Sequence, residues 1–591
     1  MIQIHYFYIF NYKAIKNVGI RLNGRYNYAM DTEKKVLTMC ENPKWEEDFW
    51  PEGVSTLSAI VGKNGSGKTT FMEAMLLMVE KGNDGKEVDA MIVCRDEKGK
   101  FFSYIPENRK YEIKGQDVDP LPDPPKIGMF YYTPYFRPVL NFYEPIRTEV
   151  MGVYNASDTW RVIKDLVDYI NVDGYHRGER MADYLDAFHR QNNNRIALLL
   201  ANKGIRDQFP ESAIPKYLLV RPSESGYKRW RNENRSNIYG VNNLGKQFWG
   251  RSKEEWLASI AYHHFYNLWA ENKGDRFVIE GAQTAFQMEF AASQNVTSAL
   301  LKTISQTPAL NKEIRKLIEV MRFLSSACVY KADTDVLYID LSQAQKNGII
   351  EKFVEYFRDA SFLTAHYFDF EIAREPAPGT QLSSGEYDML KLFSRLYDAV
   401  ILSPDKFANI DSPVLILLDE AENSYHPEWQ RKFVKMLTDF LSAMYHSANI
   451  PDFQVVLSTH SPILLSDIPV VCTNYLRREG GSGNIVSLSK KGETFGANVY
   501  DLYKDSFFME NGLIGEFAYE WIDKLRDEIE KETKIDDDKA DAYIQKIERV
   551  GDEVIRRYLF QLIEKKNKPS MVAYYKRKLL EFEGGKSYVA D

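Results

Sequence analysis

The spacing of apolar residues predicts a strand, a glycine-rich turn and a helix near the start of the chain. Residues 2–10 are rich in β-branched and aromatic side chains, which is typical of a strand. After a loop-rich segment over residues 31–52, residues 55–61 form a short apolar run that is followed by glycine. Residues 69–79 then carry apolar side chains at helical spacing. The glycines between the run and the helix predict a tight connection.

Further along the chain, the hydrophobic pattern changes. From about residue 150 to residue 327, long segments such as 179–203 and 253–270 have helical spacing, with few strand signals. The tail from about residue 506 is charged and also helical in its spacing. Between these regions strand signals return, at residues 336–341, 367–372, 414–418 and 453–457.

Composition indicates a folded protein of several structural units. The chain has 591 residues, of which 44% are hydrophobic and 27% charged. Roughly two to four units are expected at this length. Its four cysteines are scattered, which argues against a zinc ribbon or a disulfide framework. No apolar run is long enough to cross a bilayer and residues 1–10 do not resemble a signal peptide, so we expect a cytoplasmic protein with no membrane partner.

A phosphate-binding loop is predicted at residues 62–69, which satisfy the pattern GxxxxGK(S/T) between a strand and a helix. Glycines let backbone N–H groups converge on phosphates, and the helix N-terminus adds its positive end. Lys68 is expected to reach the β- and γ-phosphates, and Thr69 to ligate Mg²⁺. The alternative is an ordinary glycine turn. The expected nucleotide-binding residues of this loop are Gly62, Asn64, Gly65, Ser66, Gly67, Lys68, Thr69 and Thr70.

Two acidic residues follow the apolar run at residues 415–418. Because ligands bind at the carboxyl ends of strands in open α/β sheets, Asp419 and Glu420 are expected at such an edge. Asp419 would hold the Mg²⁺ shell, and Glu420 would polarise the attacking water. The alternative is a strand that ends in solvated acids.

Two further motifs accompany these acids. Ser383 and Glu386 fit an S-x-x-E capping box, which explains both residues without a function. A helix N-terminus that also bears Ser384 and Gly385 is nevertheless an anion site, so all four residues are candidates for nucleotide contact. His460 follows the run at 453–457 and is a candidate catalytic residue, although a lone histidine is more often structural.

The order GKNGSGKT, LSSGE, LILLDE and STHS resembles an ABC-type ATPase head of the group that includes the structure-maintenance, RecF and OLD proteins. It is also similar to bacterial anti-phage defence ATPases, including the Septu ATPase subunit and retron-associated ATPases. The segments at residues 11–17, 422–427 and 494–498 are similar to elements of these proteins. In this family the four motifs are called Walker A, the signature, Walker B and the switch histidine.

The resemblance implies an α/β fold: an ABC-type ATPase head with a mixed β-sheet and flanking helices, a large helical insertion and a helical C-terminal cap. The expected domains are an N-terminal ATPase lobe at 1–145, the insertion at 146–330, a C-terminal lobe at 331–505 and the cap at 506–591. The signature begins 320 residues after Walker A, which argues against a transporter. The family's glutamine after the strand near residue 127 has no counterpart, since that segment reads FYYTPYF.

The resemblance also implies an activity and partners. ATP and Mg²⁺ would be bound, Lys68, Glu420 and His460 would be catalytic, and Thr69 and Asp419 would ligate the metal. Two chains would form a homodimer around ATP, with each signature completing the other chain's site, and a higher oligomer is a further expectation. The dimer would control a separate effector such as an HNH nuclease, in anti-phage defence. Because no acidic TOPRIM pattern follows His460, we expect no nuclease activity in this chain.

Two alternatives to this function remain open. The chain could serve as a RecF-type or structure-maintenance-type ATPase in DNA repair or chromosome upkeep, or as a nucleotide-gated scaffold without turnover. A basic stretch with an aromatic residue, Lys228, Arg229, Trp230 and Arg231, is a candidate for nucleic-acid contact. Its alternative is a solvated loop.

Overall fold

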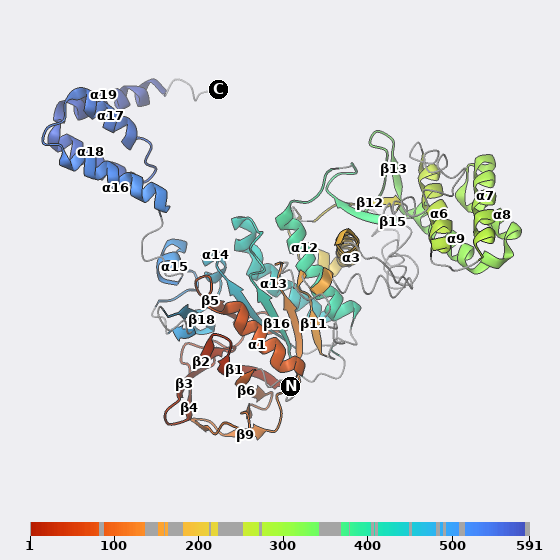
Figure 1. Ribbon diagram of the computed structural model, residues 1–591, viewed down its shortest axis with the longest axis horizontal. Coiled ribbons are helices and arrows are strands. Elements are labelled where there is room, and N and C mark those ends of the chain that lie inside the picture. Colours follow the sequence, from red (N-terminus) through yellow and green to blue (C-terminus); the bar gives the residue numbers. More distant parts are fainter. Residues whose placement is uncertain are drawn as a thin grey trace. The chain divides into compact units, whose positions relative to one another are not determined.

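A computed structural model shows two compact units, Met1–Phe508 and Met509–Asp591 (Figure 1). Each unit is described by itself. The structure describes residues 2–81, 88–135, 152–158, 160–162, 181–211, 214–222, 252–270, 275–341, 368–377, 379–403, 407, 412–447, 452–479, 485–488, 492–506 and 514–585.

The first unit is built on a large mixed sheet. Within the described residues it has 12 strands, and parallel pairs dominate its centre while antiparallel pairs dominate the N-terminal part. In spatial order the strands are β11 (Val153–Asn155), β10 (Gly128–Tyr132), β16 (Val414–Asp419), β17 (Phe453–Thr459), β5 (Val54–Val61), β18 (Thr473–Arg478), β19 (Ile485–Leu488), β2 (Ile15–Arg21), β1 (Ile2–Tyr12), β6 (Asp89–Asp96), β7 (Phe101–Tyr104) and β9 (Val118–Leu121).

Helices cover both faces of the parallel centre, which explains why its strands are apolar throughout. Leu415 and Leu417 of β16 lie in one core with Phe71 of helix α1 (Lys68–Lys81). The alternate residues of β16 belong to a second core, together with residues of α12 (Ser384–Tyr397) and α13 (Pro427–Ser447). The period of two along a strand therefore divides its side chains between the two cores (Figure 1).

A small sheet flanks the antiparallel part. It contains β3 (Tyr26–Asp31), β4 (Val36–Glu41) and β8 (Glu112–Lys114). The expectation of a loop over residues 31–52 is therefore wrong for residues 36–41, which form β4 and pair with β3 in an antiparallel hairpin. Leu37 and Met39 of β4 are buried against Tyr8 and Phe10 of β1, and this packing stabilises the strand.

The insertion is mainly helical, as expected, but it also contributes to a second sheet. Its helices are α3 (Met181–Ala201), α4 (Lys203–Arg206), α6 (Lys253–Ala270), α7 (Arg276–Ser293), α8 (Val296–Gln306) and α9 (Asn311–Ala327). The four-stranded sheet has the order β13 (Val329–Lys331), β14 (Val336–Asp340), β12 (Tyr217–Pro222) and β15 (Phe368–Ala373). The strands expected near residues 336 and 367 thus pair with β12 of the insertion and not with the main sheet.

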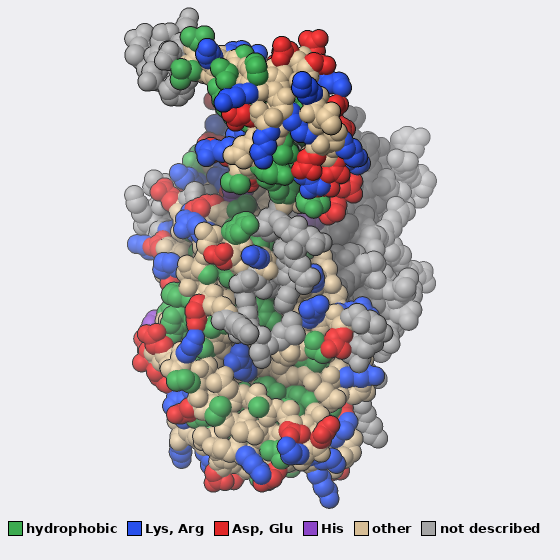
Figure 2. Space-filling view, turned by 90° about the vertical axis from the view of Figure 1, so that its left-hand side faces the viewer, with side chains coloured by type: hydrophobic (Ala, Val, Ile, Leu, Met, Phe, Trp, Pro, Cys, Tyr) green, Lys and Arg blue, Asp and Glu red, His purple; other side chains and the backbone are tan. Residues whose placement is uncertain are grey.

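The first unit ends with helix α15 (Val499–Ser506), and the second unit is helical. The second unit has a hydrophobic core of its own, which contains Leu525, Ile529, Leu559 and Ile563. No helix in the described part of the chain is long and apolar enough to cross a membrane. Basic and acidic side chains are interspersed on the face in Figure 2, in keeping with 76 Lys and Arg against 84 Asp and Glu. The helices of the second unit are α16 (Glu516–Lys531), α17 (Asp537–Ile547), α18 (Glu553–Lys566) and α19 (Lys568–Gly585).

Candidate active site

The strand order brings three of the motifs to one edge of the main sheet. β16, β17 and β5 are parallel neighbours, with Asp419 opposite Ser458 and Thr459 opposite Val61. The residues that follow these strands therefore leave the sheet side by side. Because β17 is the middle strand, His460 lies between the phosphate loop and Glu420.

The phosphate loop has the backbone that its glycines permit. Gly65 and Gly67 have φ angles of 75° and 89°, in the left-handed region that favours glycine. A Cβ atom on Gly67 would lie 2.3 Å from Ile485 Cδ1, so a side chain there requires a shift of that residue. Ser66 is buried, and its hydroxyl has no hydrogen-bond partner among the described residues. An unpaired buried hydroxyl in a loop that starts a helix fits an anionic phosphate ligand.

Lys68 is the first residue of α1 and is buried at the centre of the site. Its Nζ atom donates to the carbonyl of Gly62 at 3.2 Å, and lies 3.3 Å from Glu420 Oε1 and 2.6 Å from His460 Nε2. Burial lowers the pKa of Lys68, although the nearby carboxylate of Glu420 opposes that change. The lysine expected to bind phosphates is thus held here by the group expected to activate water.

Glu420 is surrounded by hydrogen-bond donors. Its Oε1 lies 3.0 Å from His460 Nε2, and its Oε2 accepts from Tyr135 and Asn423, each at 3.0 Å. Burial alone would raise the pKa of Glu420, but the hydrogen bond from His460 and the charge of Lys68 lower it to about 2. Its φ of 51° is uncommon for a residue with a side chain, and strained backbone of this kind clusters at functional sites.

The end of β17 positions the acidic segment through two hydroxyl groups. Ser458 Oγ donates to Asp419 Oδ1 at 2.6 Å, and the backbone N–H of Glu420 donates to Ser458 Oγ at 3.1 Å. Thr459 donates to Glu422, a buried acid whose pKa burial raises to about 7. The orientation of both expected Walker B acids therefore depends on a serine that the motif itself does not contain.

The site fits Mg²⁺ held chiefly by a nucleotide and water. Thr69 lies in the first turn of α1, and Asp419 ends the neighbouring part of the sheet. Among the described residues no group of three or more His, Cys, Asp or Glu could hold a metal. Mg²⁺ at phosphate sites is usually bound through one or two protein oxygens together with phosphates and waters. A threonine hydroxyl and one carboxylate meet that requirement.

The signature residues form the capping box that the S-x-x-E spacing predicts. Ser383 Oγ accepts from the N–H of Glu386 at 3.4 Å, and Glu386 Oε2 accepts from the N–H of Ser383 at 3.0 Å. Ser383 and Ser384 are exposed, whereas Glu386 is buried and paired with Arg374. A Cβ atom on Gly385 would lie 2.7 Å from the carbonyl of Ser424, so the absence of a side chain allows close approach to the segment after Walker B. The predicted capping box is confirmed, and contact of these residues with a nucleotide stays a prediction.

The structure thus brings Lys68, Glu420 and His460 into mutual contact, while their catalytic roles stay predictions. Three residues that contact or orient Glu420 were not predicted from the sequence: Tyr135, Asn423 and Ser458. Tyr135 lies in the segment where no glutamine was found, three residues after β10, a neighbour of β16. Its place shortly after an apolar strand could have indicated that Tyr135 lies at the edge of the sheet near Glu420. The basic stretch Lys228, Arg229, Trp230 and Arg231 lies outside the described residues.

Comparison with known proteins relates this site to ATPases. Residues 338–466 match the family described as "AAA domain, putative AbiEii toxin, Type IV TA system", a segment that contains the signature, Walker B and His460. A "Retron Vc95 probable ATPase" of Vibrio cholerae serotype O1 biovar El Tor is 24% identical over 183 residues, which are 30% of this chain and 34% of that protein. "Protein ea59" of Escherichia phage lambda is 30% identical over 130 residues, 22% of this chain and 21% of that protein.

The alignments thus span about a fifth and a third of the length of these relatives. A solved structure, "Structure of the recombination mediator protein RecF-ATPrS in RecFOR pathway", covers 83% of this chain and 98% of its own, with 10% identity and a TM-score of 0.23. The family match shows an ATPase-type domain in the C-terminal part of the first unit. The predicted resemblance to a group of ATPases that includes retron-associated members is confirmed.

Proposed function

We propose that the chain binds ATP with Mg²⁺ and hydrolyses it at the edge formed by β16, β17 and β5. One observation carries this proposal: Lys68, Glu420 and His460 follow these three strands and lie within 3.3 Å of one another. A phosphate-binding lysine, a carboxylate for the attacking water and a histidine able to contact a terminal phosphate are the groups that phosphoryl transfer to water requires.

The contacts of Lys68 suggest how binding prepares the carboxylate. Glu420 is the anion beside Lys68 in this structure. Phosphates would compete for the lysine, and loss of that charge raises the pKa of Glu420 and makes it a better proton acceptor. Tyr135, Asn423 and His460 would hold the carboxylate in place during this exchange. Thr69 and Asp419 would hold Mg²⁺, which supplies positive charge to the phosphates.

A second part of the proposal concerns the assembly of two chains into a homodimer. Ser383 and Ser384 are exposed at the N-terminus of α12, a helix of 14 residues whose positive end suits phosphate. We infer that they complete the site of a second chain, so that ATP joins a homodimer, with higher oligomers built from it. Dimer closure would then control a separate effector protein, such as an HNH nuclease, in cytoplasmic anti-phage defence. The similarity to a retron ATPase supports this role.

The experiment is to measure ATP binding and phosphate release by the purified chain and by two lysine variants of the same loop. Lys68→Ala should lose binding and turnover. Lys63→Ala removes an exposed lysine from the same loop and should keep both. Equal activity of Lys68→Ala and the unmodified chain would contradict the proposal.

A further inference from the structure

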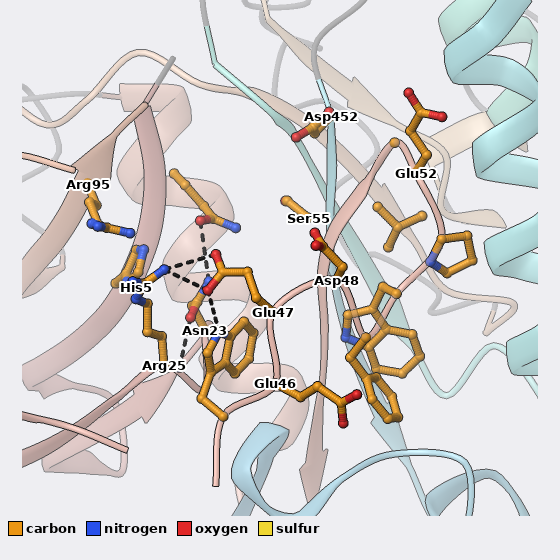
Figure 3. A pocket seen from close by; sticks show the side chains of 17 residues that line it. His5, Asn23, Arg25, Glu46, Glu47, Asp48, Glu52, Ser55, Arg95 and Asp452 are labelled. Atoms are coloured by element: carbon orange, nitrogen blue, oxygen red, sulfur yellow. Dashed lines mark hydrogen bonds and ion pairs between the residues drawn. The ribbon is translucent and has the colours of Figure 1, made fainter. Parts of the chain in front are cut away.

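A cavity of about 640 Å³ lies at the edge of the main sheet opposite the candidate active site (Figure 3). Ser55, at the start of β5, and Asp452, directly before β17, both line it. Lys68 and His460 follow the other ends of these two strands. Since a strand rises about 3.3 Å per residue, the length of β5 places the cavity on the order of 20 Å from the phosphate loop. The cavity is therefore separate from the ATP site.

The cavity contains hydrogen-bonding groups without partners. His5 is only 1% exposed, and its Nδ1 atom has no partner among the described residues. Trp50 Nε1 and Gln3 Nε2, which also line the cavity, lack partners in the same part of the chain. Burial together with the charges of Arg95 and Arg25 lowers the pKa of His5 to about 3, so this imidazole is neutral. Buried polar atoms are nearly always paired with protein, water or ligand in folded proteins, so three such atoms around one cavity make it a candidate binding site.

The charged lining is divided between two walls. Figure 3 shows Arg25 and Arg95 beside the neutral His5 and Glu47 on one side, and Asp48, Glu52 and Asp452 on the other. Arg25 is already paired with Glu47, at 2.8 Å. Arg95, by contrast, has no carboxylate partner, and the carboxylates of Asp48 and Asp452 have no hydrogen bond or ion pair, in the described part of the chain.

This arrangement leaves charges available on both walls. Burial and the charges of Glu97 and Glu52 raise the pKa of Asp452, so a cation beside it would be favourable. Arg95 donates through Nε to the carbonyl of Gly99 at 3.2 Å, which leaves its other N–H groups for an acceptor. Together with the N–H groups of Trp50 and Gln3, they favour hydrogen-bond acceptors or an anion.

The wall that carries Asp48 is fixed by backbone contacts. The carbonyl of Gly53 accepts from the N–H of Phe453 at 2.7 Å. Gly53 has a φ of 85°, and a Cβ atom there would lie 2.5 Å from Tyr445 Cβ, so the loop packs tightly against α13. Trp45 covers Gly24 in the same way. The cavity is thus preformed, which is typical of small-molecule sites of this size.

We propose that this cavity binds a small ligand in which an aliphatic chain separates an ammonium or guanidinium group from a carboxylate or amide carbonyl, as in a basic amino acid. The cation lies between Asp48 and Asp452. The carboxylate or carbonyl accepts hydrogen bonds from Arg95 and from the N–H groups of Trp50 and Gln3. A free basic amino acid and a basic residue of a polypeptide both carry this pair of groups, and the site recognises the chemistry that the two share.

The test is calorimetric titration of the full chain with L-arginine, L-lysine and Nα-acetyl-L-arginine amide. Agmatine, which lacks the carboxylate, and L-glutamate, which lacks the cationic side chain, are the ligand controls. We expect saturable binding of at least one of the first three, and at least about tenfold weaker binding of both controls. Tight binding of the capped amide but not of the free amino acids would indicate a polypeptide source, and the reverse a free metabolite.

Variants assign the contacts. Asp48→Asn is the principal one, because Asp48 is exposed and asparagine tolerates its φ of 59°. This variant and Arg95→Gln should each weaken binding about tenfold or more, whereas Glu33→Gln, an exposed acid outside the cavity, should not. Lys68→Ala should leave the affinity unchanged, so this test is independent of the ATPase proposal. Absence of binding at about 10 mM, or binding that survives both Asp48→Asn and Arg95→Gln, would overturn the assignment.

Discussion

The guanidinium of Arg395 lies 2.6 Å from the carboxylate of Asp158, in a buried contact between the signature helix α12 and the first part of the insertion. Arg395 is 0% exposed, and it also donates to the carbonyl of Ala156 and to Asn192. Lys391 donates to the same aspartate at 2.8 Å. Residues far apart in the sequence therefore hold the signature helix against the insertion.

Asp158→Asn tests this contact, because it leaves the buried guanidinium of Arg395 without an anion, while Lys391 keeps its ion pair with Asp388 at 2.8 Å. We expect it to lower the free energy of unfolding by about 3 kcal/mol or more, since breaking a buried ion pair on one side is strongly destabilising. Asp439→Asn removes the partner of Lys435 from an exposed ion pair and should change little. Urea denaturation of the three proteins measures the difference. Equal midpoints for both variants would contradict the role of Asp158.

Glu422 predicts a pH dependence of stability. Burial raises the pKa of Glu422 in the folded state from 4.5 to about 7. Between these pH values the folded state therefore keeps a proton that the unfolded state has already released. The stability associated with this proton is fully present below pH 4.5 and is lost as the pH rises to about 7. Glu422→Gln stays neutral and can still accept from Thr459. The free energy of unfolding of the variant minus that of the unmodified chain should be more positive at pH 8 than at pH 5. An identical difference at both pH values in denaturant titrations would contradict this.

The signature's role in a second chain can be tested by mixing two inactive variants. Lys68→Ala lacks the phosphate-binding lysine, and Ser383→Arg blocks the exposed N-terminus of α12. Each should be inactive alone, whereas a heterodimer contains one intact pair of surfaces and should recover about half the turnover per dimer. Turnover is measured after heterodimers have been isolated with two affinity tags. Isolated heterodimers as inactive as either parent would rule out a shared site.

Much of the candidate site was predictable because its motifs lie at strand ends. The apolar run before Asp419 and the run before His460 are buried parallel strands, and their carboxyl ends share one edge. The Ser383 capping box was predictable as well, since it depends only on residues three positions apart. The sequence does not show the order of strands in the sheet. That order places His460 between Glu420 and the phosphate loop.

The missed features depend on contacts between distant segments. Tyr135 reaches Glu420 only because β10 pairs with β16, and β12 finds its partners more than 100 residues later. The cavity lined by His5 and Asp452 is assembled from segments that no local pattern connects. β4 is held by its pairing with β3 and by its packing against β1, which are likewise contacts between separate segments.

The most direct test of the account is the rate of ATP hydrolysis by Glu420→Gln, measured at saturating ATP beside its affinity for ATP. The amide keeps the shape of the side chain but cannot accept the proton, so turnover should fall by about 10²-fold or more while binding is retained. Glu428→Gln, an exposed acid on α13, is the matched control and should keep the full rate. Undiminished turnover by Glu420→Gln would contradict the assignment of this edge of the sheet as the hydrolytic site.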